Sequence, residues 1–232
     1  MIRFEQVSFS YREGETLLSD ADGLFPPGLT LILGPNGCGK STLLKLAAGV
    51  EHPHSGRITI DGKNLWKEEV RARSRLVYLP EHPDISPYAS LLEVLTLVCR
   101  LRDEPVGRAR EALAFFGIDQ LSSRTVRELS LGQRRQAVFA AALIGTPGQI
   151  LLDEPFESMD RLIKDRILDW LNGHLRAGAV AAVATHAFER LAPMAGQALT
   201  ISGGKVIGSG PLPRHQGQRL ELLEKLAAGE AG

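Results

Sequence analysis

The sequence predicts an α/β fold with a mainly parallel sheet, an N-terminal antiparallel β region and an inserted helical subdomain. Three observations predict this class. Short apolar runs typical of buried strands lie at 29–33, 149–152 and 180–184, and the runs at 29–33 and 149–152 are each followed by a segment with helical apolar spacing. Between about 81 and 144 the pattern is mostly helical. With 232 residues, of which 44% are hydrophobic, the chain can form one large domain.

The first 80 residues predict strands around one strand–loop–helix unit. Residues 2–9 alternate as a strand does, and residues 57–60 form a second strand that ends in the turn Asp61-Gly62. Residues 29–33 form a continuous apolar run, so this strand is expected to be buried. Helical spacing follows at 40–48.

The rest of the chain predicts an interrupted continuation of the same core. A strand at 76–79 is followed by Pro80, Pro83 and Pro87, and then by helical segments from 91 to 142. The core resumes with two strands, at 149–152 and 180–184, which flank one amphipathic helix and make a βαβ unit. A hairpin and a last helix are expected after these, at 199–207 and 214–228, the helix packing its leucines on its own domain.

This pattern predicts one domain, residues 1–232, with three parts. The α/β core occupies about 1–80 and 145–211, the helical subdomain about 81–144, and the C-terminal helix about 214–228.

A glycine-rich loop stands between the strand at 29–33 and the helix at 40–48. Its G-x-x-x-x-G-K-S pattern predicts a P-loop NTPase core that binds a nucleoside triphosphate. The glycines let backbone N–H groups and the helix N-terminus point at phosphates, Lys40 adds positive charge, and the hydroxyl of Ser41 is offered to Mg²⁺. The loop residues expected to bind nucleotide are Gly34, Asn36, Gly37, Cys38, Gly39, Lys40, Ser41 and Thr42. For the Cys38 side chain, a space-filling role is favoured over a redox-sensitive one.

Two adjacent carboxylates follow the apolar run Ile150-Leu151-Leu152. Asp153 is expected to help hold Mg²⁺, and Glu154 to act as the general base that polarises the attacking water. His186 follows the strand at 180–184, at the same sheet edge, where it is expected to donate to a γ-phosphate oxygen.

Leu129-Ser130-Leu131-Gly132-Gln133 forms a serine–glycine turn before a helix expected to begin at Arg134. Ser130 is expected to be its N-cap, and the free helix N-terminus is a second phosphate site for nucleotide held by another subunit.

Taken in order, these motifs, then Ser158-Met159-Asp160 and His186, resemble the ATP-binding cassette (ABC) ATPases, specifically the nucleotide-binding subunit of a membrane transporter. The resemblance implies an ATPase with ATP and Mg²⁺ as cofactors. It implies that Tyr11 stacks on adenine, although a tyrosine closing a hairpin is the alternative. Ser130, Gly132 and Gln133 would contact ATP of the opposite cassette, Asp160 would link the two sites, and His186 would be the switch histidine.

The resemblance also implies partners and a location. A second, identical cassette would close head to tail over two ATP molecules. The free energy of this cycle would be delivered to an integral membrane permease. The chain would lie in the cytoplasm, on the inner face of the membrane. The permease is expected at residues 82–101, with contacts at Tyr88, Leu91 and Leu92, although core packing is the alternative for each leucine.

Three residues depart from the family pattern. Glu81 stands where a glutamine is usual and is expected to be a metal ligand; it favours export over import. Leu131 replaces a glycine, and Met159 a smaller or apolar residue. Hydrolysis is still expected, because Lys40 and Glu154 are present.

Bulk properties restrict the function classes. The 27 basic and 27 acidic residues balance, so nucleic acid is not an expected partner. Two cysteines argue against a disulfide framework and for a reducing compartment. The N-terminus lacks the apolar core of a signal peptide, and no run is long enough to span a bilayer.

Three alternatives remain open. The first is a kinase, which would leave residues 130–133 and His186 unexplained. The second is a soluble cassette ATPase that acts on ribosomes or DNA. The third is a regulatory cassette that binds ATP with little turnover, an alternative suggested by Glu81 and Leu131.

Overall fold

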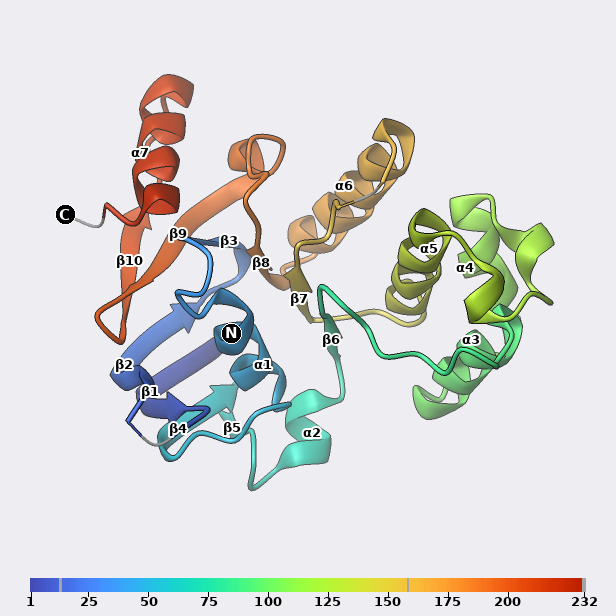
Figure 1. Cartoon of the computed structure of the whole chain (residues 1–232), viewed down its shortest axis with the longest axis horizontal. Helices are drawn as coiled ribbons and strands as arrows, with labels where there is room; N and C mark the ends of the chain where they lie inside the picture. The colour runs from blue at the N-terminus through green and yellow to red at the C-terminus, as the bar shows by residue number, and fades with distance from the viewer. Residues whose placement is uncertain (13, 158, 231–232) are drawn as a thin grey trace.

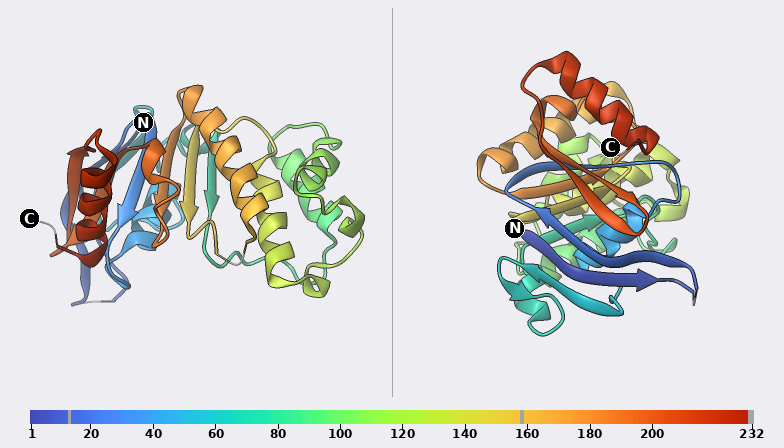
Figure 2. Two further views of the ribbon diagram at one scale, coloured as in Figure 1. Left: turned by 90° about the horizontal axis from the view of Figure 1, so that it is seen from above. Right: turned by 90° about the vertical axis from the view of Figure 1, so that its left-hand side faces the viewer.

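The structure is a computed structural model that describes residues 1–12, 14–157 and 159–230. It has a larger lobe built on two β-sheets and a smaller helical lobe beside it (Figures 1 and 2). In the described part of the chain, no helix has the length and apolar character needed to cross a membrane.

A six-stranded sheet forms the centre of the larger lobe, in the order β10-β9-β3-β8-β7-β6. Each neighbouring pair is parallel except the β9–β10 hairpin. The predicted mainly parallel sheet is therefore confirmed. Its strands are β3 (Gly28–Leu33), β6 (Leu76–Leu79), β7 (Gln149–Asp153), β8 (Val180–Ala184), β9 (Ala195–Ser202) and β10 (Lys205–Pro211).

A four-stranded antiparallel sheet, in the order β2-β1-β4-β5, covers one side of this core. One apolar cluster joins it to helix α1 (Lys40–Ala48) and to one face of the central sheet, through side chains such as Phe4, Leu43 and Leu151. The predicted N-terminal antiparallel region is thus confirmed. Its strands are β1 (Ile2–Ser10), β2 (Thr16–Phe25), β4 (Ser55–Ile60) and β5 (Lys63–Asn64).

Helices α6 (Arg161–Arg176) and α7 (Gln216–Ala228) cover the opposite face of the central sheet. Ile163, Ile167 and Leu171 of α6 are buried, as the helical spacing predicts. In α7, Leu223 and Leu226 are buried, while Leu220 and Leu222 pack against the same cluster. The last helix therefore packs on its own domain, as expected.

The helical lobe lies in the chain between β6 and β7. It contains α3 (Leu91–Leu101), α4 (Arg108–Phe116), α5 (Leu131–Ala142) and the 3₁₀ turns η1 (Asp119–Leu121) and η2 (Val126–Glu128). Its side chains are continuous with the α6 and α7 cluster. Helix α5 begins at Leu131, earlier than the expected Arg134, because Ser130 already caps it and accepts from the Gln133 amide.

Several short or polar elements, the two-residue strand β5 among them, were not predicted. β2 pairs with β1 although its sequence contains Asp20, Asp22 and Gly23, which read as loop. Helix α2 (Glu69–Arg73) has five residues, too few to show a helical apolar period, and the turn η3 (Ala192–Met194) has three.

Candidate functional site

Four neighbouring strands, β3, β8, β7 and β6, end at one edge of the central sheet, and predicted site residues follow each of them. Carboxyl ends of parallel strands meet at one edge, so residues far apart in the chain become neighbours. They line one cavity of about 630 Å³. The predicted residues at its wall are Tyr11, Asn36, Gly37, Gly39, Lys40, Ser41, Thr42, Glu81, Asp153, Glu154 and His186.

The phosphate loop curls between β3 and α1 because its three glycines, Gly34, Gly37 and Gly39, adopt backbone angles that other residues avoid. Gly34 has φ 137°, and a Cβ atom there would lie 2.8 Å from the Cys38 sulfur. Gly39, at φ 111°, is the N-cap residue of α1. The side chain of Cys38 is partly buried and packs against the apolar cluster that contains α1, and Cys38 does not line the cavity. This agrees with a space-filling role for the thiol.

Lys40 is 8% exposed, and its ammonium donates to three groups. These are the carbonyl oxygens of Gly34 (2.8 Å) and Pro35 (3.1 Å), and Nε2 of His186 (3.3 Å). An ammonium group has three donors and no acceptor, so Nε2 of His186 accepts here and the ring proton is on Nδ1. The positive charge is therefore held inside the loop, beside the histidine that follows β8.

Asp153 ends β7 and is 4% exposed. Burial raises the pKa of its carboxyl group; a hydrogen bond with Ser41 opposes this rise, and the nearby charge of Glu81 adds to it. Two carboxylates and a hydroxyl at one wall form an oxygen-only donor set with excess negative charge, which is the chemistry that suits Mg²⁺. Ser41, Asp153 and Glu81 therefore fit this ion.

Glu154 is held rigidly beside His186. It has a left-handed backbone (φ 44°), and its carboxylate accepts from the Thr185 hydroxyl (3.0 Å) and from the His186 backbone N–H (3.0 Å). Nε2 of His186 lies 3.8 Å from the carboxylate. Burial raises the pKa of Glu154, and these donors oppose the rise. The result is a fixed, desolvated carboxylate at the cavity wall, suited to accept a proton from water.

Tyr11 follows β1 and stands at the mouth of the cavity, with 56% of its surface exposed. The Thr42 hydroxyl donates to its hydroxyl (3.3 Å), and its ring packs edge-on against Phe9. The exposed ring face is available to a planar base. The residue is therefore placed beside the phosphate loop.

The remaining predicted residues do not line this cavity. Ser130, Gly132 and Gln133 lie at the N-terminus of α5 in the helical lobe, where Ser130 and Gln133 form a reciprocal capping box. Asp160 is exposed and caps α6 by accepting from the Ile163 amide. Ser158 lies outside the described residues. One copy of the chain thus holds two separate sets of predicted phosphate-binding groups.

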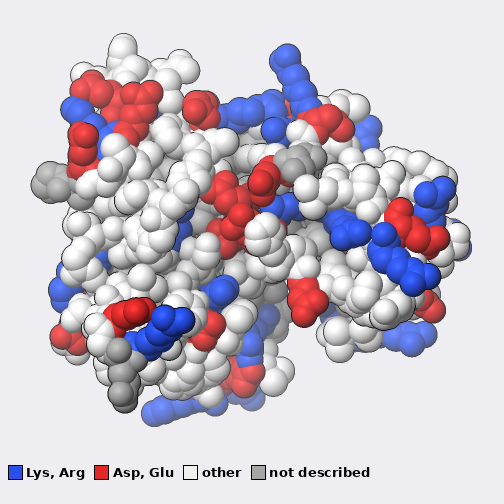
Figure 3. All heavy atoms as spheres, in the orientation of Figure 1, with Lys and Arg blue, Asp and Glu red and all other residues white. Residues whose placement is uncertain are grey.

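Acidic side chains gather near the middle of the face shown in Figure 3, and the helical lobe carries both basic and acidic side chains. Besides the predicted carboxylates, Glu157 lines the cavity. Its carboxylate pairs with Arg135 of α5 at 3.0 Å. Sequence reasoning missed this pair, because the two residues belong to no motif and meet only through the fold. No sequence signal marked Arg135 as buried, because it stands in a polar stretch between Arg134 and Gln136.

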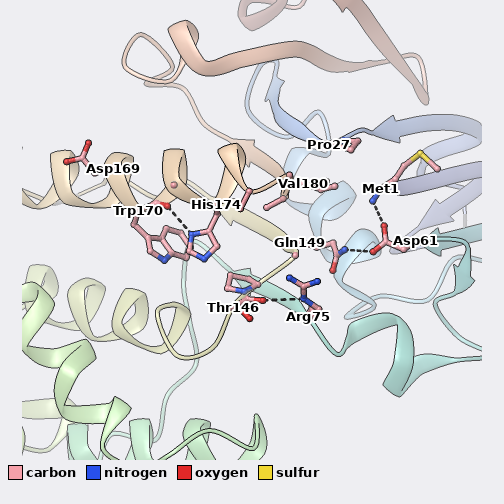
Figure 4. Close-up of a pocket in the computed structure, with 16 residues that line it drawn as sticks. Met1, Pro27, Asp61, Arg75, Thr146, Gln149, Asp169, Trp170, His174 and Val180 are labelled. Carbon is pink, nitrogen blue, oxygen red and sulfur yellow. Dashed lines mark hydrogen bonds and ion pairs between the residues drawn. The ribbon is translucent and has the colours of Figure 1, made fainter.

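A second hollow, of about 460 Å³, lies at the opposite edge of the sheet. Figure 4 shows Trp170 and His174 of α6 on one side of it and Arg75 beneath them. Asp61 accepts from the N-terminal amine and from Gln149, which ties β1 and β4 to β7. None of the predicted site residues lies there, so the chemistry described above is confined to the first cavity.

Comparison with known proteins gives consistent matches. A family model described as ABC transporter matches residues 23–157. The chain is 32% identical to the taurine import ATP-binding protein of Pseudomonas aeruginosa, over 97% of this chain and 86% of that protein. It is 31% identical to the molybdenum import ATP-binding protein of Rhodopseudomonas palustris, over 90% of this chain but only 57% of that protein. Both relatives are named as import proteins, whereas Glu81 favoured export.

Among solved structures, the fold is similar to a dimeric ATP-binding cassette in a post-hydrolysis state, bound to ADP and phosphate. The TM-score is 0.81 at 22% identity, covering 90% of this chain and 98% of that one. At this identity the similarity shows a shared fold, and it agrees with the predicted fold class.

Proposed function

This chain belongs to the ABC transporter family of ATP-binding proteins, and we propose that it is the ATPase subunit that powers substrate movement through a membrane permease. One observation carries the proposal. The phosphate loop, Glu81, the buried Asp153, the fixed Glu154 and His186 converge on one cavity from four adjacent strand ends. This arrangement supplies a phosphate cradle, an oxygen site for a cation and a base for water.

Nucleotide binding uses the loop first. Backbone N–H groups at the start of α1 face the phosphates of ATP, and Lys40 turns from its carbonyl partners toward them. Tyr11 stacks on the adenine ring. Ser41, Asp153 and Glu81 would hold Mg²⁺, which when bound neutralises part of the phosphate charge.

Hydrolysis then depends on Glu154 and His186. Glu154 takes a proton from the water that attacks the γ-phosphorus, as the bond to the ADP oxygen breaks. His186 follows the neighbouring strand β8 and donates a ring N–H to a γ-phosphate oxygen. For this it must leave Lys40, which its Nε2 contacts at 3.3 Å. When the γ-phosphate arrives between His186 and Lys40, each of the two side chains exchanges its contact with the other for a contact with the phosphate.

The second phosphate-binding set points to a second copy of the chain. The N-terminus of α5 lies outside the cavity and has Leu131 64% exposed beside Ser130. In a head-to-tail dimer, residues 130–133 of each copy meet the γ-phosphate in the other, and Asp160 lies near the junction. ATP closes the dimer and hydrolysis opens it. The cassette of similar fold bound to ADP and phosphate is itself dimeric.

The membrane partner docks on the helical lobe. Within the expected segment, Leu91 is buried and Leu92 packs against the core, so both serve packing. Tyr88 is 73% exposed, and Leu97 and Leu101 are also exposed. These three side chains form the proposed contact with the permease, which places the chain in the cytoplasm at the inner face of the membrane. Both relatives described above are import ATP-binding proteins, which supports a transport partner.

Glu154→Gln tests the function. The variant should bind Mg-ATP and form a dimer that persists, because the cradle remains while the base is lost; phosphate release should fall at least about 100-fold. Sedimentation and a phosphate-release assay measure both properties. Asp165→Asn, a change on the exposed side of α6, is the control and should behave as wild type.

Two outcomes oppose the proposal. Monomers of Glu154→Gln at saturating Mg-ATP would refute the dimer. A wild-type chain that binds ATP without releasing phosphate, alone or with its permease, would instead establish the regulatory alternative.

A further inference from the structure

The hydroxyl of Tyr78 is an exception among the buried polar atoms of the described chain. Tyr78 lies in β6 and is half-buried, but its hydroxyl oxygen is shielded from solvent and has no hydrogen-bond partner among the described residues. A buried polar group without a partner destabilises the folded chain, so native proteins retain few of them. A phenylalanine would fill almost the same space without this penalty.

The register of the central sheet places Tyr78 beside the cation site. Tyr78 pairs with Leu151 in the parallel ladder of β6 and β7, and side chains alternate between the two faces along a strand. Asp153 comes two residues after Leu151, so it lies on the same face as Tyr78, nearer the carboxyl edge. Helix α1, which carries Ser41, covers this face, because Tyr78 and Leu151 pack in the same apolar cluster as α1.

The charges around Tyr78 agree with this placement. Burial raises the pKa of Tyr78, and the nearby negative charge of Asp153 adds to the rise. The phenol is therefore protonated at neutral pH and can donate. The carboxylate of Asp153 has a hydrogen bond with Ser41, and its two oxygens can accept more than one. A donor without an acceptor thus lies near an acceptor with remaining capacity.

We propose that Tyr78 is a positioning residue for the cation site, whose hydroxyl donates to the carboxylate of Asp153 and orients it toward the ion. This rests on the proposed function, in which Asp153 helps to hold Mg²⁺. No hydrogen bond joins the two side chains in the structure, so the contact forms by a rotation of one of them. Groups that orient a metal ligand typically contribute about 10–100-fold to metal affinity or activity.

Tyr78→Phe tests the proposal, because it keeps the ring and removes only the hydroxyl. Its affinity for ADP should be about tenfold weaker than that of wild type in Mg²⁺, and within about twofold of wild type in EDTA, since only the cation site has lost a contact. Titration calorimetry measures both affinities, and ADP avoids turnover and the ATP-dependent dimer. In an Asp153→Asn background, Tyr78→Phe should have no further effect, which identifies Asp153 as the acceptor.

Stability gives a second readout that needs neither metal nor nucleotide. The urea midpoint of Tyr78→Phe should be about 0.5 M above that of wild type, because a buried group without a partner has been removed. Thr200→Val is the matched control. It removes another unpartnered buried hydroxyl, on β9, which β3 and β8 separate from β7. It should also raise the urea midpoint, and the effect of Mg²⁺ on ADP affinity should stay as in wild type.

Three results would overturn the proposal. They are wild-type ADP affinity of Tyr78→Phe in Mg²⁺, equal losses of affinity in Mg²⁺ and in EDTA, and a urea midpoint below that of wild type, which would mean that the hydroxyl is already paired. A wild-type ADP affinity that does not respond to Mg²⁺ would refute the cation site itself. Failure of the proposed function is distinguishable, because wild type would then release no phosphate while its ADP affinity still responded to Mg²⁺.

Discussion

Three charged side chains of the site have partners within the protein. All three Lys40 donors are in use, Glu154 accepts two hydrogen bonds from the segment after β8, and Ser41 is a hydrogen-bond partner of Asp153. Charged groups that are buried cost free energy unless they are paired. These partners hold the side chains in place at the cavity wall, and we expect ATP binding to exchange some of them.

Lys40→Ala should lose ATP affinity and keep the fold. Charge-assisted hydrogen bonds are worth about 1.5–3 kcal/mol each, so the dissociation constant should rise at least about tenfold. The loop keeps its shape, because this depends on glycine backbone angles at Gly34 and Gly39. Titration calorimetry with ATP measures affinity, and circular dichroism checks the fold.

Lys63→Ala, on the exposed strand β5, is the control for lost charge. Wild-type ATP affinity in Lys40→Ala would contradict the role of the phosphate loop.

At the scale of elements, two helical segments of the helical lobe, α3 and η2, begin with capping boxes that contain a glutamate. Glu93 closes the capping box of α3 with Ser90, and Glu128 closes that of η2 with Thr125. Donation from Ser90 lowers the pKa of Glu93, and donation from Thr125 lowers that of Glu128. Both boxes hold segments that lead toward α5, so they help to place its free end.

These boxes predict an acid-sensitive lobe. A carboxyl group whose pKa is lower in the folded chain stabilises it above the unfolded pKa, and this contribution disappears as pH falls through the folded pKa. Wild-type stability should therefore fall through the acid range in which these glutamates are protonated. Glu93→Gln with Glu128→Gln should be less stable at neutral pH and show a shallower decline.

Urea unfolding at a series of pH values measures this effect, with Glu111→Gln on α4 as a control that lies in no capping box. An unchanged pH slope in the double variant would contradict the assignment.

Elements with a regular apolar pattern could be predicted from the sequence. Elements that form only through pairing with a neighbouring strand could not. Apolar runs or helical apolar spacing mark β3, α1, β7 and β8 in the sequence, and tertiary contacts stabilise these elements further. β2 contains three residues that disfavour strands, and it exists because β1 supplies hydrogen-bond partners along its length. Local sequence does not encode that partner.

The same distinction applies to the site. Gly34, Asp153 and His186 could be placed together, because parallel strands bring their carboxyl ends to one edge. The pair of Arg135 with Glu157 could not, since it depends on the packing of α5 beside β6 and on the path of the chain after β7. Its discovery required the three-dimensional arrangement of the two lobes.

At the scale of the whole molecule, the two sets of predicted phosphate-binding groups lie in different lobes. The cavity belongs to the sheet lobe, and the capped end of α5 belongs to the helical lobe beside it (Figure 2). In the proposed head-to-tail dimer, another copy brings its own nucleotide, and each lobe completes the site of its partner.

Leu131→Glu tests this arrangement at the proposed dimer face. Leu131 is 64% exposed at the start of α5, where the dimer would bring it near the partner's γ-phosphate. A carboxylate there would face like charge, which costs several kcal/mol in an interface, so the ATP-dependent dimer should weaken by at least about 100-fold. Monomer affinity for ATP should not change, because Leu131 lies outside the cavity.

The matched control is Val70→Glu, which adds the same charge at an 85% exposed site on α2. Both variants are made in the Glu154→Gln background, so that turnover does not empty the sites, and sedimentation with Mg-ATP measures the dimer. Because the two changes add equal charge, a loss of dimer in Leu131→Glu alone assigns the effect to the α5 end. Equal dimerisation of the two variants would place the contact elsewhere and exclude the head-to-tail geometry.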